Sequence, residues 1–85
     1  MVAAMPPRSR HFDPLVTRIR DSRLPSPAVR RETREAADVS IREAAEELHV
    51  APMTLLRWER GDAQPRRAHA IAYRQFLDAL REAVS

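Results

Sequence analysis

The feature that most constrains the fold is a strong helix start signal in the middle of the chain. Ser40 and Glu43 have the spacing of a capping box, in which the serine hydroxyl and the glutamate carboxylate each accept a hydrogen bond from a backbone amide. Apolar residues at helical spacing follow it. This pattern predicts a helix from Ile41 to about Leu48.

A second helix follows after a short break at residues 49–51. Pro52 suits the first turn of a helix, because its missing N–H has no partner there in any case. Gly61 can end the same helix in the left-handed conformation. The sequence therefore predicts two short helices, 41–48 and 52–60, joined by a tight turn.

The rest of the chain also favours helices. Asp13 is a candidate N-cap for a short helix to about Arg23, and Ser26 is one for a helix to about Ala37. Apolar residues repeat at three- and four-residue intervals from Ala68 to the C-terminus, which predicts a long amphipathic helix. We find no strand pattern, so the fold class is all-α, a small bundle of four to five helices.

The chain has 85 residues, which are enough for one compact domain. Residues 1–24 are interpreted as a basic N-terminal arm with a short helix, and residues 25–85 as the folded domain with its long C-terminal helix. The Pro-rich run at residues 24–27 separates the two.

Composition excludes several classes of function. There is no Cys, and the three His residues are too scattered for a metal cluster, so we expect no metal and no cofactor. No nucleophile and base are arranged for catalysis, so an enzyme is not expected. The chain lacks a signal peptide and an apolar run that could span a bilayer, which predicts a cytoplasmic protein with no membrane partner.

Charge is distributed unevenly along the chain. Residues 1–34 hold eight Arg against three acidic residues, whereas residues 35–50 hold one Arg against five. All fifteen basic residues are Arg, the side chain best suited to phosphates and to guanine edges. A body with one basic side is typical of a protein that docks on a polyanion.

Two helices joined by a tight turn can place one helix across the DNA backbone and the next in the major groove. Such a crossing needs a small residue inside the first helix, and Ala45 stands there. It also needs apolar residues on both sides of the turn. These fall at Ala44, Leu48, Val50, Leu55 and Trp58.

With its Trp58-Glu59-Arg60-Gly61 run and Pro65, the segment from Ser40 to Pro65 resembles the Xre/Cro family of phage-type repressors. The resemblance extends from about Val29 to Leu80. It implies a lambda-repressor-like helix-turn-helix. It also implies an ion pair between Arg34 and Glu59. The family prefers Gly at the positions of Asp38 and His49 in this chain.

The resemblance places the base-reading positions on the start of the second motif helix. Arg57 is the best base reader, because Arg can donate to guanine O6 and N7 together. Met53 offers only contact with thymine methyl groups. Two alternatives stay open, that Met53 and Leu56 belong to the core and that Arg57 is simply solvated. The predicted base-reading residues are Ala51, Pro52, Met53, Thr54, Leu56 and Arg57.

Phosphate contacts are expected on both sides of the reading helix, because helix N-termini and Arg attract phosphate. Arg8 and Arg10 in the N-terminal arm could enter a minor groove, or the arm could be unstructured. The predicted phosphate contacts are Ser40, Ile41, Arg42, Arg60, Arg66 and Arg67.

We expect a homodimer, since proteins of this type usually bind two half-sites related by a two-fold axis. The predicted interface is the apolar stripe of the C-terminal helix, with the helix at residues 13–23 as a second candidate. That stripe consists of Tyr73, Phe76, Leu77, Leu80 and Val84.

The sequence therefore predicts a regulator of transcription, of phage or bacterial type, that binds double-stranded DNA and represses a promoter by occupying its operator. One alternative is the antitoxin of a toxin–antitoxin pair, in which residues 1–24 would bind a protein partner. Another is a helix-turn-helix module that uses Met53 and Leu56 on a protein partner.

Overall fold

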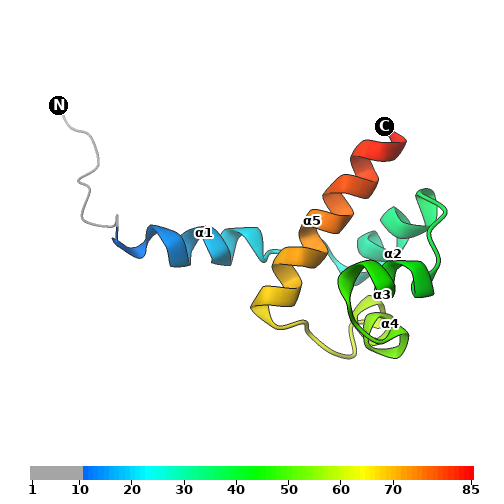
Figure 1. Ribbon diagram of the computed structural model, residues 1–85, viewed down its shortest axis with the longest axis horizontal. Helices are drawn as coiled ribbons and strands as arrows, with labels where there is room; N and C mark the ends of the chain where they lie inside the picture. Colours follow the sequence, from blue (N-terminus) through cyan, green and yellow to red (C-terminus); the bar gives the residue numbers. More distant parts are fainter. Residues whose placement is uncertain (1–10) are drawn as a thin grey trace.

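The computed structural model describes residues 11–85, which fold into five α-helices and no strand, as the helical periodicity predicts (Figure 1). Helices α3 and α4 are the two helices of the predicted motif. The bounds are α1 Asp13–Asp21, α2 Pro27–Ala36, α3 Ile41–Leu48, α4 Pro52–Arg60 and α5 Arg67–Val84.

Local sequence signals set most of the helix ends. The Glu43 amide donates to Ser40 Oγ at 3.0 Å and the Ser40 amide donates to Glu43 Oε1 at 2.9 Å, so the capping box is complete. The hydrogen bond that the Ser40 amide donates to the Glu43 carboxylate is the main cause of a lowered pKa of Glu43. Gly61 ends α4 with a φ of +78°.

One predicted cap is wrong. Helix α1 begins at Asp13 itself, and Phe12 occupies the N-cap position without a side-chain hydrogen bond. A single 3₁₀ turn at residues 11–12 precedes the helix, which moves Asp13 inside the first turn. There its carboxylate is still favourable, because it lies near the positive end of the helix dipole.

The hydrophobic core lies where α3 and α4 pack together under α5. Ala45 is fully buried, and its small side chain lets the two motif helices approach closely. Leu55 and Trp58 supply the core side chains of α4, and the Trp58 ring packs 5.6 Å from the Tyr73 ring of α5, centre to centre. The buried core consists of Ala44, Ala45, Leu48, Leu55, Trp58, Tyr73 and Leu77.

A buried arginine joins α2 to α4. Arg30 is only 5% exposed, and it donates to the backbone oxygens of Pro25 at 2.8 Å and Trp58 at 3.0 Å. Its guanidinium carbon also lies 5.8 Å from the centre of the Tyr73 ring. These contacts satisfy a charge that would otherwise be costly to bury.

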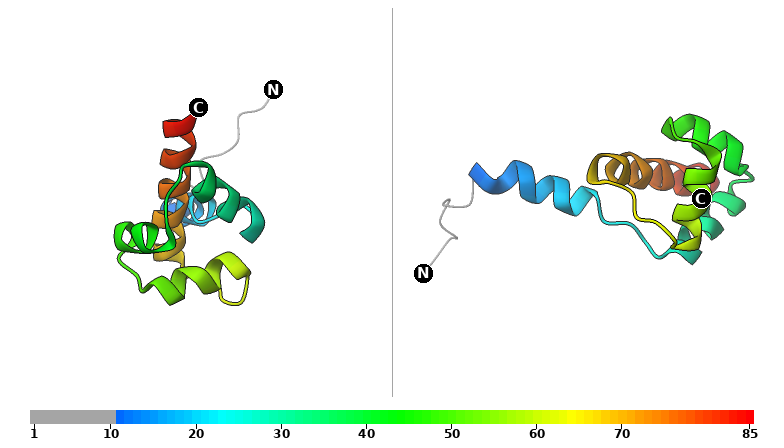
Figure 2. Two further views of the ribbon diagram at one scale, coloured as in Figure 1. Left: turned by 90° about the vertical axis from the view of Figure 1, so that its right-hand side faces the viewer. Right: turned by 90° about the horizontal axis from the view of Figure 1, so that it is seen from below.

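Helix α1 extends away from the other helices, so that the described part of the chain is 52 Å long and 19 Å across its shortest axis (Figure 2). No residue of α1 is buried. Its C-terminal end packs against α5, where the Arg74 guanidinium donates to the Arg20 carbonyl. The direction of α1 is therefore fixed at one end.

Candidate nucleic-acid interface

The turn between α3 and α4 holds the second helix across the first. His49 ends α3 in the left-handed conformation with a φ of +56°, and the Val50 amide donates to the Ala45 carbonyl at 3.0 Å. Val50 is half-buried and packs against the core. This arrangement leaves the N-terminal half of α4 at the surface.

One face of α4 is exposed along its whole length. Successive helical residues are rotated by about 100°, so Met53, Arg57 and Arg60 lie on one side, opposite Leu55 and Trp58. All three are exposed. Met53 is the apolar member of the row, and 56% of its surface is accessible. A guanidinium four residues from an apolar side chain can meet a base edge while the apolar side chain meets a methyl group.

Other predicted base readers have different surroundings. Ala51 and Pro52 are exposed at the start of α4, whereas Thr54 is half-buried. Leu56 is half-buried and lines a small cleft with Arg31 and Arg34 of α2 and with Glu59. It therefore lies between α2 and the exposed row, beside Arg60.

The start of α3 has fewer groups for phosphate than its sequence suggests. Both the hydroxyl and the amide of Ser40 are used in the capping box. The side chain of Ile41 is half-buried and packs against the core. Only first-turn amides of α3 and the exposed Arg42 side chain therefore remain as donors at this end.

Exposed arginines continue past the end of α4. Arg60 is its last residue, and Arg66 and Arg67 stand at the start of α5. The Arg66 N-cap makes no side-chain hydrogen bond to the first turn of α5. Two guanidinium groups therefore lie beside amides that need acceptors, which is a suitable environment for a phosphate.

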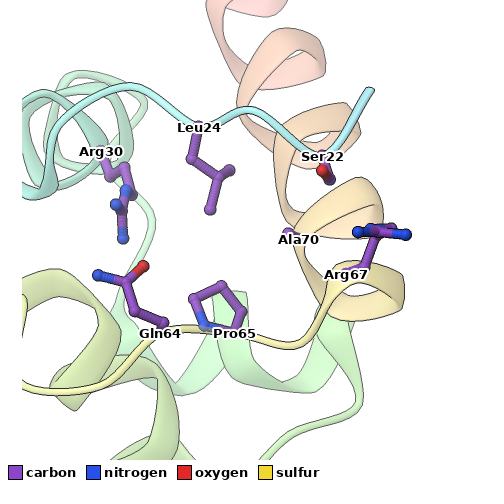
Figure 3. A pocket seen from close by; sticks show the side chains of 7 residues that line it. All are labelled: Ser22, Leu24, Arg30, Gln64, Pro65, Arg67 and Ala70. Carbon is purple, nitrogen blue, oxygen red and sulfur yellow. The ribbon is translucent and has the colours of Figure 1, made fainter. Parts of the chain in front are cut away.

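A shallow pocket of about 360 Å³ lies between the α1–α2 link and the start of α5 (Figure 3). Arg30 and Arg67 are both among its lining residues, but they stand at opposite sides, and Arg67 points away from Arg30 (Figure 3). Arg30 is bound to backbone oxygens. Arg30 and Arg67 are therefore not placed to bind one anion together in this pocket. Its lining residues are Ser22, Leu24, Arg30, Gln64, Pro65, Arg67 and Ala70.

Arg34 and Glu59 are brought together by α2 and α4. Arg34 Nε lies 2.5 Å from Glu59 Oε2, and Nη2 donates to Oε1 at 2.9 Å. The third guanidinium nitrogen donates to the Val39 carbonyl at 2.8 Å. The hydrogen bonds that Arg34 donates to Glu59 raise the pKa of Arg34.

The residues expected in a dimer interface on α5 do not form one surface. Tyr73 and Leu77 are each 1% exposed and belong to the core, which corrects their assignment to an interface. Phe76 and Leu80 are half-buried, and Val84 is exposed near the C-terminus. The buried part of the apolar stripe of α5 therefore belongs to the hydrophobic core.

Arg8 and Arg10, for which the sequence left open a minor-groove contact or an unstructured arm, lie outside the described residues. Within residues 11–85, no three His, Cys, Asp or Glu side chains come together as they would around a metal ion. The same part of the chain contains no helix that is long and apolar enough to cross a membrane.

Comparison with known families gives one match. The family model HTH_3, described as helix-turn-helix, matches residues 31–82, which include α3, the turn and α4. Searches of curated proteins and of solved structures gave no match. Since the matched segment covers more than half of the chain, this protein belongs to the HTH_3 family of Xre/Cro-type helix-turn-helix domains, which bind DNA.

Proposed function

We propose that this protein is a sequence-specific DNA-binding regulator of transcription, a repressor of phage or bacterial type that binds its operator as a dimer. The observation that carries the proposal is the exposed row of Met53, Arg57 and Arg60 on α4. Placed in a major groove, this row brings one guanidinium and one apolar side chain to the base edges.

Arg57 is the proposed base reader, with guanine as its preferred partner. Met53 contributes contact with thymine methyl groups, and Ala51 and Pro52 allow close approach of the backbone. Arg42, Arg60, Arg66 and Arg67 are the proposed phosphate contacts, because each is exposed on the segments that flank the reading face.

An apolar protein-binding face on α4 is the competing proposal, and the surroundings of Leu56 weigh against it. Leu56 is half-buried and is bordered by Arg31, Arg34, Glu59 and Arg60, so it adds little apolar surface to that of Met53. A protein interface needs a contiguous apolar patch. A single exposed Met among arginines fits DNA better.

The dimer follows from the size of the reading unit. One helix contacts too few base pairs to select a site in a genome. When two copies bind half-sites one helical turn apart, the sequence preferences of the two half-sites multiply. Occupation of such a site within a promoter blocks transcription. This makes repression the expected sign of regulation.

A binding-site selection from random duplexes tests the proposal. We expect the wild-type protein to select a two-fold symmetric motif, and Arg57→Ala to lose the preference at one position of each half-site. Arg81→Ala is the matched control, because Arg81 is exposed on α5 far along the chain from the motif. If the wild-type protein selects no motif at low salt, the proposal is overturned.

A further inference from the structure

Helix α1 carries an apolar stripe that residues 11–85 leave exposed. Phe12, Leu15, Val16 and Ile19 recur at three- and four-residue spacing, so they lie on one side of the helix. Between 39% and 53% of each of these residues is accessible, although all four are large and apolar. Among the helices of residues 11–85, no other presents such a continuous exposed apolar face.

The described residues that follow α1 do not fold over this stripe. The Arg20 carbonyl is bound by Arg74 at the C-terminal end of α1, and the chain then turns through Pro25 toward α2. Beyond that end α1 extends away from α2, α3 and α4 (Figures 1 and 2). A helix of nine residues is marginal on its own in water, so its stability depends on packing of the apolar face.

The charges beside the stripe match a second copy of the same helix in antiparallel orientation. Asp13 and Arg20 are seven residues apart, two turns of helix, and flank the same edge of the stripe. When two copies of α1 pack about a two-fold axis near Val16, Asp13 of one copy lies opposite Arg20 of the other. A parallel pair would put Asp13 and Arg20 of the two copies on opposite edges of the interface, where neither meets its counterpart.

We propose that α1 is the dimer interface, formed by an antiparallel pair of α1 helices from two copies of the chain. Val16 lies near the axis, and Leu15 of one copy packs beside Ile19 of the other. The use of this dimer in binding two half-sites rests on the proposed function. Dimer formation itself is measured without DNA.

Sedimentation velocity of the full chain over a concentration series, without DNA, tests the interface. We expect a reversible dimer for the wild type. Val16→Glu should raise its Kd at least about tenfold, because two carboxylates would meet at the axis. Thr17→Glu is the matched control on the opposite side of α1 and should leave the Kd within about twofold. Neither position is buried, so both variants keep the core intact.

A charge exchange tests the antiparallel orientation. Asp13→Arg and Arg20→Asp should each weaken the dimer, because each places like charges opposite one another. The variant carrying both changes should recover most of the wild-type Kd. In a parallel pair the double variant would gain nothing, so absence of recovery would overturn the orientation.

A wild-type chain that sediments as a monomer at every concentration would overturn the interface itself. Binding of that monomer to vesicles of anionic lipid, lost in Val16→Glu, would assign the face to a membrane surface instead. Failure of the proposed DNA binding would give a different result from failure of the dimer interface. In that case the dimer and its response to Val16→Glu persist, but no motif is selected from random duplexes.

Discussion

Arg34 on α2 and Glu59 on α4 form a two-pronged ion pair from which water is largely excluded, with the Glu59 side chain only 4% exposed. The same guanidinium holds the Val39 carbonyl just before α3. One arginine therefore joins the helix before the motif, the entry to the motif and the end of the reading helix. The position of α4 depends on this contact.

Glu59→Ala should lower the free energy of unfolding by about 3 kcal/mol, because it leaves a poorly solvated guanidinium without its partner. Urea unfolding followed by circular dichroism measures the change. Glu35→Ala is the control, since it breaks the exposed Arg31–Glu35 pair and should cost less than about 0.5 kcal/mol. Glu43→Ala should also cost less than Glu59→Ala. Equal losses for Glu43→Ala and Glu59→Ala would contradict the structural role of the pair.

Tyr73 should make the protein sensitive to alkaline pH. Burial of its hydroxyl, which finds no hydrogen-bond partner among residues 11–85, raises the pKa of Tyr73 to about 12. In the unfolded chain the pKa is about 10. The unfolded state therefore releases its proton first, and stability that is intact below pH 10 falls by about 2 kcal/mol as the pH rises to about 12.

The composition of the chain lets the titration of Tyr73 be measured with little interference from other groups. Tyr73 is the only Tyr, and the chain contains no Lys and no Cys, so little else titrates in this window. Absorbance at 295 nm should show a midpoint near the folded pKa. Tyr73→Phe should abolish the pH dependence and gain about 1 kcal/mol, because it removes an unsatisfied buried hydroxyl. A folded-state midpoint near pH 10 would show that the hydroxyl is solvated.

Two non-glycine residues with positive φ offer sites for stabilisation. Asp38 has a φ of +58° and His49 a φ of +56°, a region that glycine occupies without strain. His49→Gly should raise stability by about 0.5–1 kcal/mol, since relief of strain exceeds the entropy that glycine adds to the unfolded chain. His49→Val should lower it. A drop in melting temperature for His49→Gly would mean that the His side chain stabilises the turn.

The arginines around α4 should differ in their response to salt. Arg42→Ala should weaken binding to all duplexes alike and reduce the slope of log K against log salt by about 1, as expected for one phosphate contact. Arg57→Ala should change the preferred sequence instead. Fluorescence anisotropy between low and moderate salt separates the two effects. An unchanged slope for Arg42→Ala would remove it from the phosphate contacts.

Features that depend on neighbouring residues could be predicted well from the sequence. The Ser40 capping box, the helix starts at Pro27 and Pro52, and the end of α4 at Gly61 all rest on contacts within one helical turn. The family resemblance added the Arg34–Glu59 pair, whose members lie 25 positions apart. Nothing local to either residue would have indicated it.

Features that depend on the packing of helices distant in the sequence could not be predicted from the sequence. Arg30 resembles its exposed neighbour Arg31 in the sequence, and its partners are backbone oxygens, which leave no trace in residue type. Tyr73 and Leu77 share one apolar stripe with Leu80 and Val84, yet only the first two meet the core. Periodicity identifies an apolar face, but it does not say which part of that face other helices bury.

The hydrogen bonds of Arg74 and Arg30 connect α1 to α4 with no long flexible segment between them. Two chains joined through α1 would hold their α4 helices at one separation. An operator whose half-sites were moved by a base pair would then have to bend or twist to meet both helices. The elasticity of the DNA between the half-sites, which α4 never touches, would thus help to decide which promoters this protein occupies.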